Sequence, residues 1–349
     1  MGTIWFWLVA IMIATYVLLD GFDLGAGAIH LFVAKTDEER RQVLASIGPV
    51  WDGNEVWLIA AGGTLYFAFP ALYASAFSGF YLPLMIVLWL LILRGASIEF
   101  RNHIKSAVWD PLWDFLFCAA SLLLAVFFGA ALGNVVRGVP LDASGYFFEP
   151  LWTNFRLGDD TGILDWYTIL VGALALLALM MHGALWLQMK TSGEVHARAG
   201  RLASRAWWGV VALTALVTAF TFSIQPQVKE NFTTWPVGFL FPLLAVAGIA
   251  GVLFELRHHD ERKAFFASCA YLAGMLTSVV FGVYPMILPA RNPIYSLTVA
   301  TAKAGDYGLK IGLAWWIIGI ILATGYFTYV YRFFAGKVVV DKDSHGYGD

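Results

Sequence analysis

The sequence predicts an all-α integral membrane protein with about nine transmembrane helices. Of its 349 residues, 60% are hydrophobic and only 13% are charged, whereas ordinary globular proteins contain about 25% charged residues. The mean hydropathy is +0.71. A helix needs about 20 mostly apolar residues to span a bilayer, and nine stretches of this chain meet or approach that length.

Each apolar stretch predicts one helix. The first lacks the basic segment of a cleaved signal peptide and continues through an acidic motif, so we interpret it as a retained helix. The second and third are separated only by Phe69-Pro70, which predicts a tight turn and makes eight spans the alternative. The stretches centre on Trp5–Ile29, Asn54–Ala68, Leu72–Leu93, Leu112–Leu132, Trp166–Leu187, Trp207–Ile224, Val237–Leu256, Phe265–Ile287 and Lys310–Phe333.

Basic residues alternate between the connections. Those that follow odd-numbered helices carry 14 Lys and Arg residues, and those that follow even-numbered helices carry 5. The positive-inside rule therefore predicts an extracytoplasmic N-terminus and a cytoplasmic C-terminal tail. The alternation favours nine spans over eight, because with one helix fewer the basic connections would no longer all lie on the same side of the membrane.

The longest connection divides the chain into two halves. It has fewer than thirty residues, too few for an extramembrane domain of typical size, so we expect the protein to act in or at the membrane. The division predicts four helices in residues 1–136, an extracytoplasmic connection over 137–164 and four helices in 165–290. A peripheral helix and a cytoplasmic tail would then occupy 291–349.

Ionisable residues interrupt the otherwise apolar first three helices. A charge near the centre of a bilayer costs about 2.5–3.5 kcal/mol, so such residues usually mark an ion path, a proton relay or a buried charge pair. Asp20 and Asp23 lie three residues apart on one helix face, near the predicted cytoplasmic side. Asp52 and Glu55 open the second helix from that side, and Arg94 closes the third.

These residues predict a polar pocket open to the cytoplasm. An arginine within about 4–6 Å keeps an acid ionised, whereas a second acid nearby favours its protonated form. Two structural alternatives remain open. Asp52 could simply cap the second helix, and Asp20 and Asp23 could form a structural charge pair beside glycines that allow close helix packing.

The sequence does not predict a cofactor bound by this chain alone. A low-spin haem usually needs two axial ligands, most often His or Met, and His182 is the only histidine placed inside a helix, with no partner opposite it. Cys118 and Cys269 occur singly, and no set of residues has metal-ligand spacing. The absence of a polybasic block argues against a nucleic-acid partner.

Several motifs resemble the second subunit of the cytochrome bd-type quinol oxidases. They extend in the family's order over nearly the whole chain, except for the final helix and tail, and the string WDGNEVWL is long enough to be specific. They are DGFDLG at 20–25, GPVWDGNEVWLI at 48–59, AFSGFY at 76–81, LR at 93–94, RGVP at 137–140, LQMKT at 187–191 with GE at 193–194, and SLT at 296–298.

The resemblance implies a subunit of a respiratory terminal oxidase in the bacterial cytoplasmic membrane. In that family quinol is oxidised at the partner, subunit I, which ligates two b-type haems and one d-type haem, and dioxygen is reduced to water with protons drawn from the cytoplasm. Each subunit has two four-helix bundles and one peripheral helix. Whether a structural quinone or lipid binds this subunit, and whether a small single-helix accessory subunit joins the complex, stay open.

The resemblance also assigns candidate residues. Asp52 matches an acid with a role in proton delivery, with Asp23 and Arg94 in the same neighbourhood, and Trp57 matches a hydrophobic passage for dioxygen found in some members. His182 occupies a position that is not histidine throughout the family. Two other classes remain as alternatives, a secondary transporter or proton channel and a purely structural scaffold subunit. Against the transporter, no helix is visibly broken at corresponding positions of the two halves.

Overall fold

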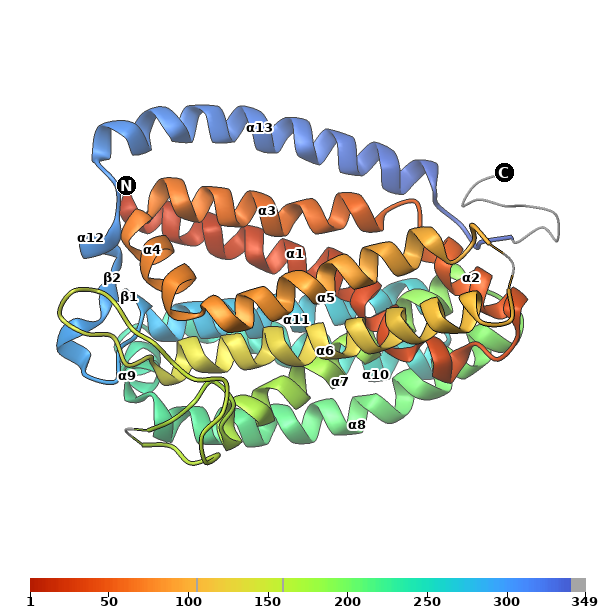
Figure 1. The fold of residues 1–349 in the computed structure, drawn as a ribbon, viewed down its shortest axis with the longest axis horizontal. Coiled ribbons are helices and arrows are strands. Elements are labelled where there is room, and N and C mark those ends of the chain that lie inside the picture. Colours follow the sequence, from red (N-terminus) through yellow and green to blue (C-terminus); the bar gives the residue numbers. More distant parts are fainter. Residues whose placement is uncertain (105, 159, 340–349) are drawn as a thin grey trace.

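A computed structural model describes residues 1–104, 106–158 and 160–339. In this part of the chain, nine long helices run in alternating directions between the two ends of an elongated bundle (Figure 1). They are α1 (Gly2–Val33), α3 (Trp51–Ala68), α5 (Tyr81–Phe100), α6 (Trp109–Arg137), α7 (Trp166–Lys190), α8 (Gly193–Ile224), α10 (Leu240–His258), α11 (Glu261–Val283) and α13 (Asp306–Phe333).

Short elements lie at the ends of these helices. They are α2 (Asp37–Ile47), α4 (Pro70–Gly79), α9 (Pro226–Thr234), the 3-10 turns η1 (Pro236–Phe239) and η2 (Pro293–Tyr295), the antiparallel strands β1 (Met286–Leu288) and β2 (Leu297–Thr298), and α12 (Val299–Ala302). We call the end that holds α2 the α2 end, and the end that holds the two strands the β1 end.

The predicted class and the approximate number of spans are confirmed. Eight helices of the described residues are long and apolar enough to cross a membrane. The ninth, α3, has 18 residues, and its first five include the polar residues Asp52, Asn54 and Glu55. It lies beside α1 and runs back to the β1 end (Figure 1), so it completes the alternation of directions.

Two predicted boundaries are wrong, and proline accounts for both. The stretch Leu72–Leu93 is not one span but α4 followed by α5, because Pro83 has no N–H to bond the carbonyl of Gly79 and its ring would collide with that carbonyl. The stretch Phe265–Ile287 ends as a helix at Val283, because the residue before a proline, here Tyr284, disfavours helical geometry.

The basic connections share one end of the bundle. Every connection that follows an odd-numbered span lies at the α2 end, where the chain also emerges from α13 (Figure 1). Lys105 and Lys342, two of the basic residues counted above, and the tail from residue 340 lie outside the described residues. Which end faces the cytoplasm stays a prediction of the positive-inside rule.

Close helix contact joins the two halves of the chain. Gly25 on α1 and Gly183 on α7 face each other so closely that a Cβ atom on Gly25 would lie 1.9 Å from the carbonyl oxygen of Leu179. Small residues let helix backbones approach in this way inside membranes. One hydrophobic core cluster runs from α1 and α6 through α7 to α11. The two sets of four helices therefore share a core, and their bounds at 136 and 165 stay predictions.

The connection between α6 and α7 is fixed by buried charges at the β1 end. Glu149 accepts hydrogen bonds from Arg137, at 2.6 Å, and from Arg291. Arg137 also pairs with Asp165, which caps α7. Burial raises the pKa of Glu149, against the opposing effect of the two guanidinium groups. This network holds the connection against the segment that follows α11.

Candidate functional site

Arg94 is the centre of a buried polar cluster between α1, α3 and α5. Its guanidinium donates one hydrogen bond to Asp20 at 2.7 Å and another to Glu55 at 2.9 Å. The side chains of Arg94 and Asp20 are fully buried, whereas that of Glu55 is 21% exposed. The structure thus brings together three of the predicted residues, Asp20, Glu55 and Arg94, and Arg94 is the partner of both acids.

Asp23 lies one helical turn further along α1 and is also fully buried. One of its oxygens accepts a hydrogen bond of 2.7 Å from the amide nitrogen of Asn54. The amide oxygen of Asn54 accepts a hydrogen bond of 2.7 Å from the hydroxyl of Tyr331 on α13. Asp23 forms no ion pair with any described residue, so its only strong partner is a neutral amide.

The cluster contains more acids than bases. Asp20 and Glu55 share the guanidinium of Arg94, and Asp23 is held by the amide of Asn54, so the three carboxyl groups are accompanied by one basic side chain. One oxygen of Asp23 and the Nε of Arg94 are buried without a hydrogen-bond partner among the described residues, although most buried polar atoms in proteins have one. A purely structural charge pair would need neither the extra carboxyl groups nor these unpaired atoms.

Asp52 does not join Arg94. It lies in the first turn of α3 at the α2 end, exposed, with no hydrogen bond or ion pair to any described residue. The capping alternative is not supported, because the N-cap residue of α3 is Val50 and no side chain caps the helix. Asp52 shares one exposed face of α3 with Val56 and Ile59.

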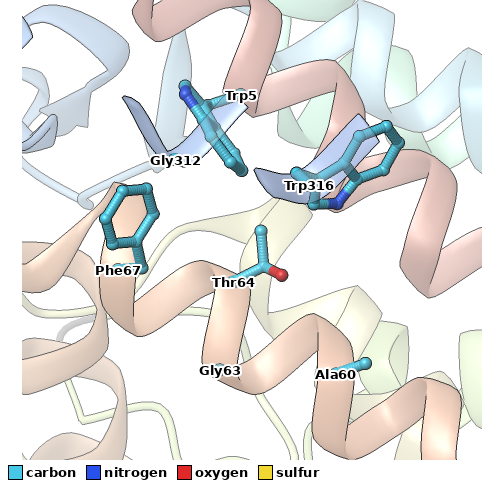
Figure 2. Close-up of a pocket in the computed structure, with 7 residues that line it drawn as sticks. All are labelled: Trp5, Ala60, Gly63, Thr64, Phe67, Gly312 and Trp316. Carbon is cyan, nitrogen blue, oxygen red and sulfur yellow. The ribbon is translucent and has the colours of Figure 1, made fainter. Parts of the chain in front are cut away.

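Trp57 packs between α3 and α13. Its ring is half-buried and lies 5.6 Å from that of Phe327. Nearer the β1 end the same two helices leave an open groove with a volume of about 320 Å³ (Figure 2). The groove is lined mostly by apolar and aromatic side chains: Trp5, Ala60, Gly63, Thr64, Phe67, Gly312 and Trp316.

His182 has both ring nitrogens occupied. They lie 2.7 Å from the hydroxyl of Ser268 and 3.0 Å from the carbonyl oxygen of Leu18, and the ring stacks on Phe265. Neither nitrogen is free to coordinate iron in this arrangement. Among the residues that the structure describes, no group of three or more His, Cys, Asp or Glu side chains could hold a metal ion.

A second buried cluster lies at the α2 end and was missed from the sequence. Asp114 on α6 contacts His30 at 2.8 Å, Arg40 at 2.9 Å and Arg101 at 2.7 Å. A histidine near the end of one span and basic residues in two connections gave no signal beyond the positive-inside pattern. Tyr331 was missed as well, because tyrosine near a helix end is ordinarily explained as an interfacial anchor.

Among the described residues, eight helices apolar enough to cross a membrane, with carboxyl groups buried around one arginine, define an integral membrane protein with charged groups inside its helix bundle. The chain belongs to the family of cytochrome bd terminal oxidase subunit II, whose family model matches residues 1–334. The curated relatives agree with this assignment, and their match covers the chain almost completely.

Three of these relatives come from different bacteria. The probable cytochrome oxidase subunit 2 of Haemophilus influenzae is 31% identical over 98% of this chain and 97% of its own length. Subunit 2 of the cytochrome bd-I ubiquinol oxidase of Escherichia coli K12 is 30% identical, over 88% and 87%. Subunit 2 of the cytochrome bd ubiquinol oxidase of Bacillus subtilis is 31% identical, over 88% of each chain.

The fold has a solved counterpart. A chain of the bd oxidase from Geobacillus thermodenitrificans superimposes with a TM-score of 0.74 over 95% of this chain and 98% of that one, at 18% identity. At that identity the likeness shows the fold. The chain is therefore a multi-span subunit of a bacterial oxidoreductase complex, as its family membership states.

Proposed function

We propose that this chain is the haem-free subunit of a quinol oxidase, and that it conducts protons from the cytoplasm towards the site of dioxygen reduction and stabilises the haem-bearing subunit I. The observation that carries the proposal is the cluster in which Arg94 and Asn54 hold Asp20, Glu55 and Asp23 inside the bundle. Family membership supports the oxidase reading over a secondary transporter.

The charges of the cluster support proton binding. Burying several carboxylates around one guanidinium leaves uncompensated negative charge in a medium of low dielectric constant, which is costly. A bound proton removes that cost, and its release to a neighbouring acceptor restores it. Reduction of dioxygen to water consumes protons, so carboxyl groups of this kind suit a relay.

The exposure of the acids follows an order that a relay needs. Asp52 is exposed at the α2 end, Glu55 follows three residues later with a side chain 21% exposed, and Asp20 and Asp23 are fully buried. We expect protons to enter at Asp52 and to move inward through Glu55, if the α2 end faces the cytoplasm as the positive-inside rule predicts.

The partner subunit should cover the outer face of α3 and α5. On α3 the large apolar side chains of Val56 and Ile59 are exposed beside Asp52, and α5 exposes Trp89. Without the partner, these side chains and Asp52 would be exposed to lipid. Burial against a partner would enclose the relay, so we expect the chain to be unstable without subunit I. A stable, monodisperse lone subunit in detergent would contradict this.

The haems are expected on the partner. The family implies two b-type haems and one d-type haem, and His182 of this chain does not fit as a haem ligand, because both of its ring nitrogens are occupied. A reduced-minus-oxidised spectrum of this chain with and without subunit I tests the assignment. Haem bands should appear only with the partner, and substrate uptake by the lone chain would instead favour a transporter.

Substitution of the buried acids tests the relay. Glu55→Gln and Asp23→Asn remove titratable groups and preserve size. We expect both complexes to assemble with normal haem spectra and to consume dioxygen much more slowly. The exposed Asp142, in the connection at the β1 end, provides a control variant, Asp142→Asn, with normal turnover. Full turnover in both buried variants would refute the relay.

A further inference from the structure

The last long helix, α13, contributes one polar group to the buried cluster. The helix lies along one long edge of the bundle (Figure 1), and among its residues only Leu309 is fully buried. Its end nevertheless turns inward at Tyr331, whose hydroxyl donates to the amide oxygen of Asn54 at 2.7 Å. This is the contact through which α13 reaches the carboxyl groups.

We propose that Tyr331 is a positioning residue for Asp23. Together with the carbonyl oxygen of Leu19, which can only accept, it holds the Asn54 amide in one orientation and thereby sets which protonation state of Asp23 the site favours. The inference rests on the proposed proton relay and extends that relay to a helix that no motif of the sequence had connected with it.

The chemistry of the amide explains how this works. An amide oxygen only accepts hydrogen bonds and an amide nitrogen only donates them. Because Tyr331 donates to the oxygen of Asn54, the nitrogen is left to face Asp23 at 2.7 Å and the carbonyl oxygen of Leu19 at 3.4 Å. A donor at that place stabilises the carboxylate form of Asp23. A rotated amide would present its oxygen, which pairs only with the protonated acid.

A strap fixes Tyr331 in place. We define the C-terminal strap as residues 334–338. The ammonium group of Lys190 donates to the carbonyl oxygen of Phe334 at 2.5 Å, and the amide of Val338 donates to the carbonyl oxygen of Lys190 at 2.7 Å. Lys337 pairs with Glu261 at 3.1 Å. The end of α13, which carries Tyr331, is thereby tied to α7 and α11.

Other titratable groups face the same site from four helices. Asp20 approaches from α1, Glu55 from α3, Arg94 from α5 and the thiol of Cys269 from α11. Replacing tyrosine by phenylalanine at position 331 leaves all of them and the ring contact with Trp186 unchanged. A shift in pH dependence would therefore report the loss of the hydroxyl.

The primary test is Tyr331→Phe in the complete complex with subunit I. We expect normal haem content, turnover lower by roughly 3- to 10-fold through the loss of one hydrogen bond, and a pH profile of turnover displaced to higher pH. The control is Tyr329→Phe, on the exposed face of the same helix, which should leave both the turnover and its pH profile unchanged. An unaltered pH profile in Tyr331→Phe would overturn the proposal.

A double-mutant cycle identifies the route of the effect. Because Tyr331 acts through Asn54, adding Tyr331→Phe to Asn54→Ala should lower turnover no further. Independent, additive losses would overturn the proposal, since they would mean that Tyr331 acts elsewhere.

Failure of the relay itself has a different signature. If Asp23→Asn kept full turnover, the proposed relay through Asp23 would be refuted, and so would the role proposed for Tyr331 in turnover. The same cycle followed by thermal unfolding would then show whether the contact stands. Non-additive losses of stability in Tyr331→Phe and Asn54→Ala would retain Tyr331 as a structural partner of Asn54, and additive losses would refute that contact too.

Discussion

The guanidinium of Arg101 donates to Asp114 at 2.7 Å, and both side chains are almost completely buried. The pair joins the end of α5 to the beginning of α6. Arg101 also forms an ion pair with Asp37 on α2, and the side chains of Arg40 and His30 also contact the carboxylate of Asp114. One carboxylate therefore organises four helices at the α2 end.

Asp114→Asn tests this arrangement. Removing one partner of a buried ion pair costs about 3–5 kcal/mol, because the other charge stays buried without compensation. We expect a lower melting temperature and poorer assembly, with normal turnover per haem in the complexes that do form. Thermal unfolding of the purified complex measures the loss, and Glu99→Gln, at an exposed position near the end of α5, serves as a comparison. Unchanged stability would show that the pair contributes nothing.

Asp52→Asn tests the outer end of the proposed relay. The amide keeps the size of the side chain and cannot titrate. We expect a complex with its haems in place that consumes dioxygen at least roughly tenfold more slowly, within the range lost when a positioned acid or base is removed, and Asp52→Glu should retain more activity. Full turnover of the assembled Asp52→Asn complex between about pH 6 and 8 would reduce Asp52 to a surface residue.

His182→Ala tests the absence of a haem ligand. Because its two nitrogens bond to Ser268 and to the carbonyl of Leu18, we expect the substitution to lower thermal stability through a cavity and unpaired polar groups. All three haem bands of the assembled complex should persist. Loss of any band at normal subunit levels would sink the haem-free assignment.

Trp57→Ala tests the passage for dioxygen. Removing the indole opens the contact with Phe327 between α3 and α13, so dioxygen should reach the complex more easily. We expect a lower apparent KM for dioxygen and an unchanged kcat at saturating dioxygen, measured with an oxygen electrode. Trp57→Phe, which keeps most of the ring, should behave like the unsubstituted complex. Equal KM values in all three would place the passage elsewhere.

Glu39→Gln should lose its effect on stability as the pH falls. Partial burial raises the pKa of Glu39. Hydrogen bonds from Arg198 and from the N–H groups of Lys35 and Thr36 outweigh this effect and hold the pKa below its usual value. The stabilisation that ionised Glu39 contributes to the folded state is therefore fully present above its pKa in the unfolded chain, about 4.3. It is lost as the pH falls through its pKa in the folded protein.

We expect the difference in melting temperature between the unsubstituted complex and Glu39→Gln to be small at neutral pH, because the pair with Arg198 is still partly exposed to solvent, and to vanish in acid. Glu194→Gln is the control, because Glu194 is the more exposed partner of Arg198. A difference that grows towards acidic pH would contradict the assigned sign.

The sequence predicts the spans well because apolar length is a local property. It also predicts that Asp23, Asp52 and Arg94 lie at similar depth on consecutive helices, since depth follows from position along each helix. The acids that bond to Arg94 are instead Asp20 and Glu55. It does not predict the rotation of a helix about its axis, which is decided by packing. Asp52 and Glu55 are three residues apart, yet Glu55 turns to Arg94 while Asp52 faces outward.

Long-range partners were beyond sequence reasoning for a related reason. Tyr331 bonds to Asn54 across 277 positions of the chain, and no periodicity within α13 reveals this. Asp114 likewise appeared as one acid near a helix start, although three basic side chains from other segments converge on it. Such clusters form only when helices distant in sequence dock.

The contact between Tyr331 and Asn54 has a consequence for biosynthesis. Translation starts at the N-terminus, so α1, with Asp23, is inserted into the membrane long before the ribosome reaches α13, which follows every other helix that the structure describes. During that interval the Asn54 amide has no phenol to orient it. The orientation that we assign to the working site therefore arises only as synthesis nears its end, and a chain truncated before residue 331 would present the same acids without it.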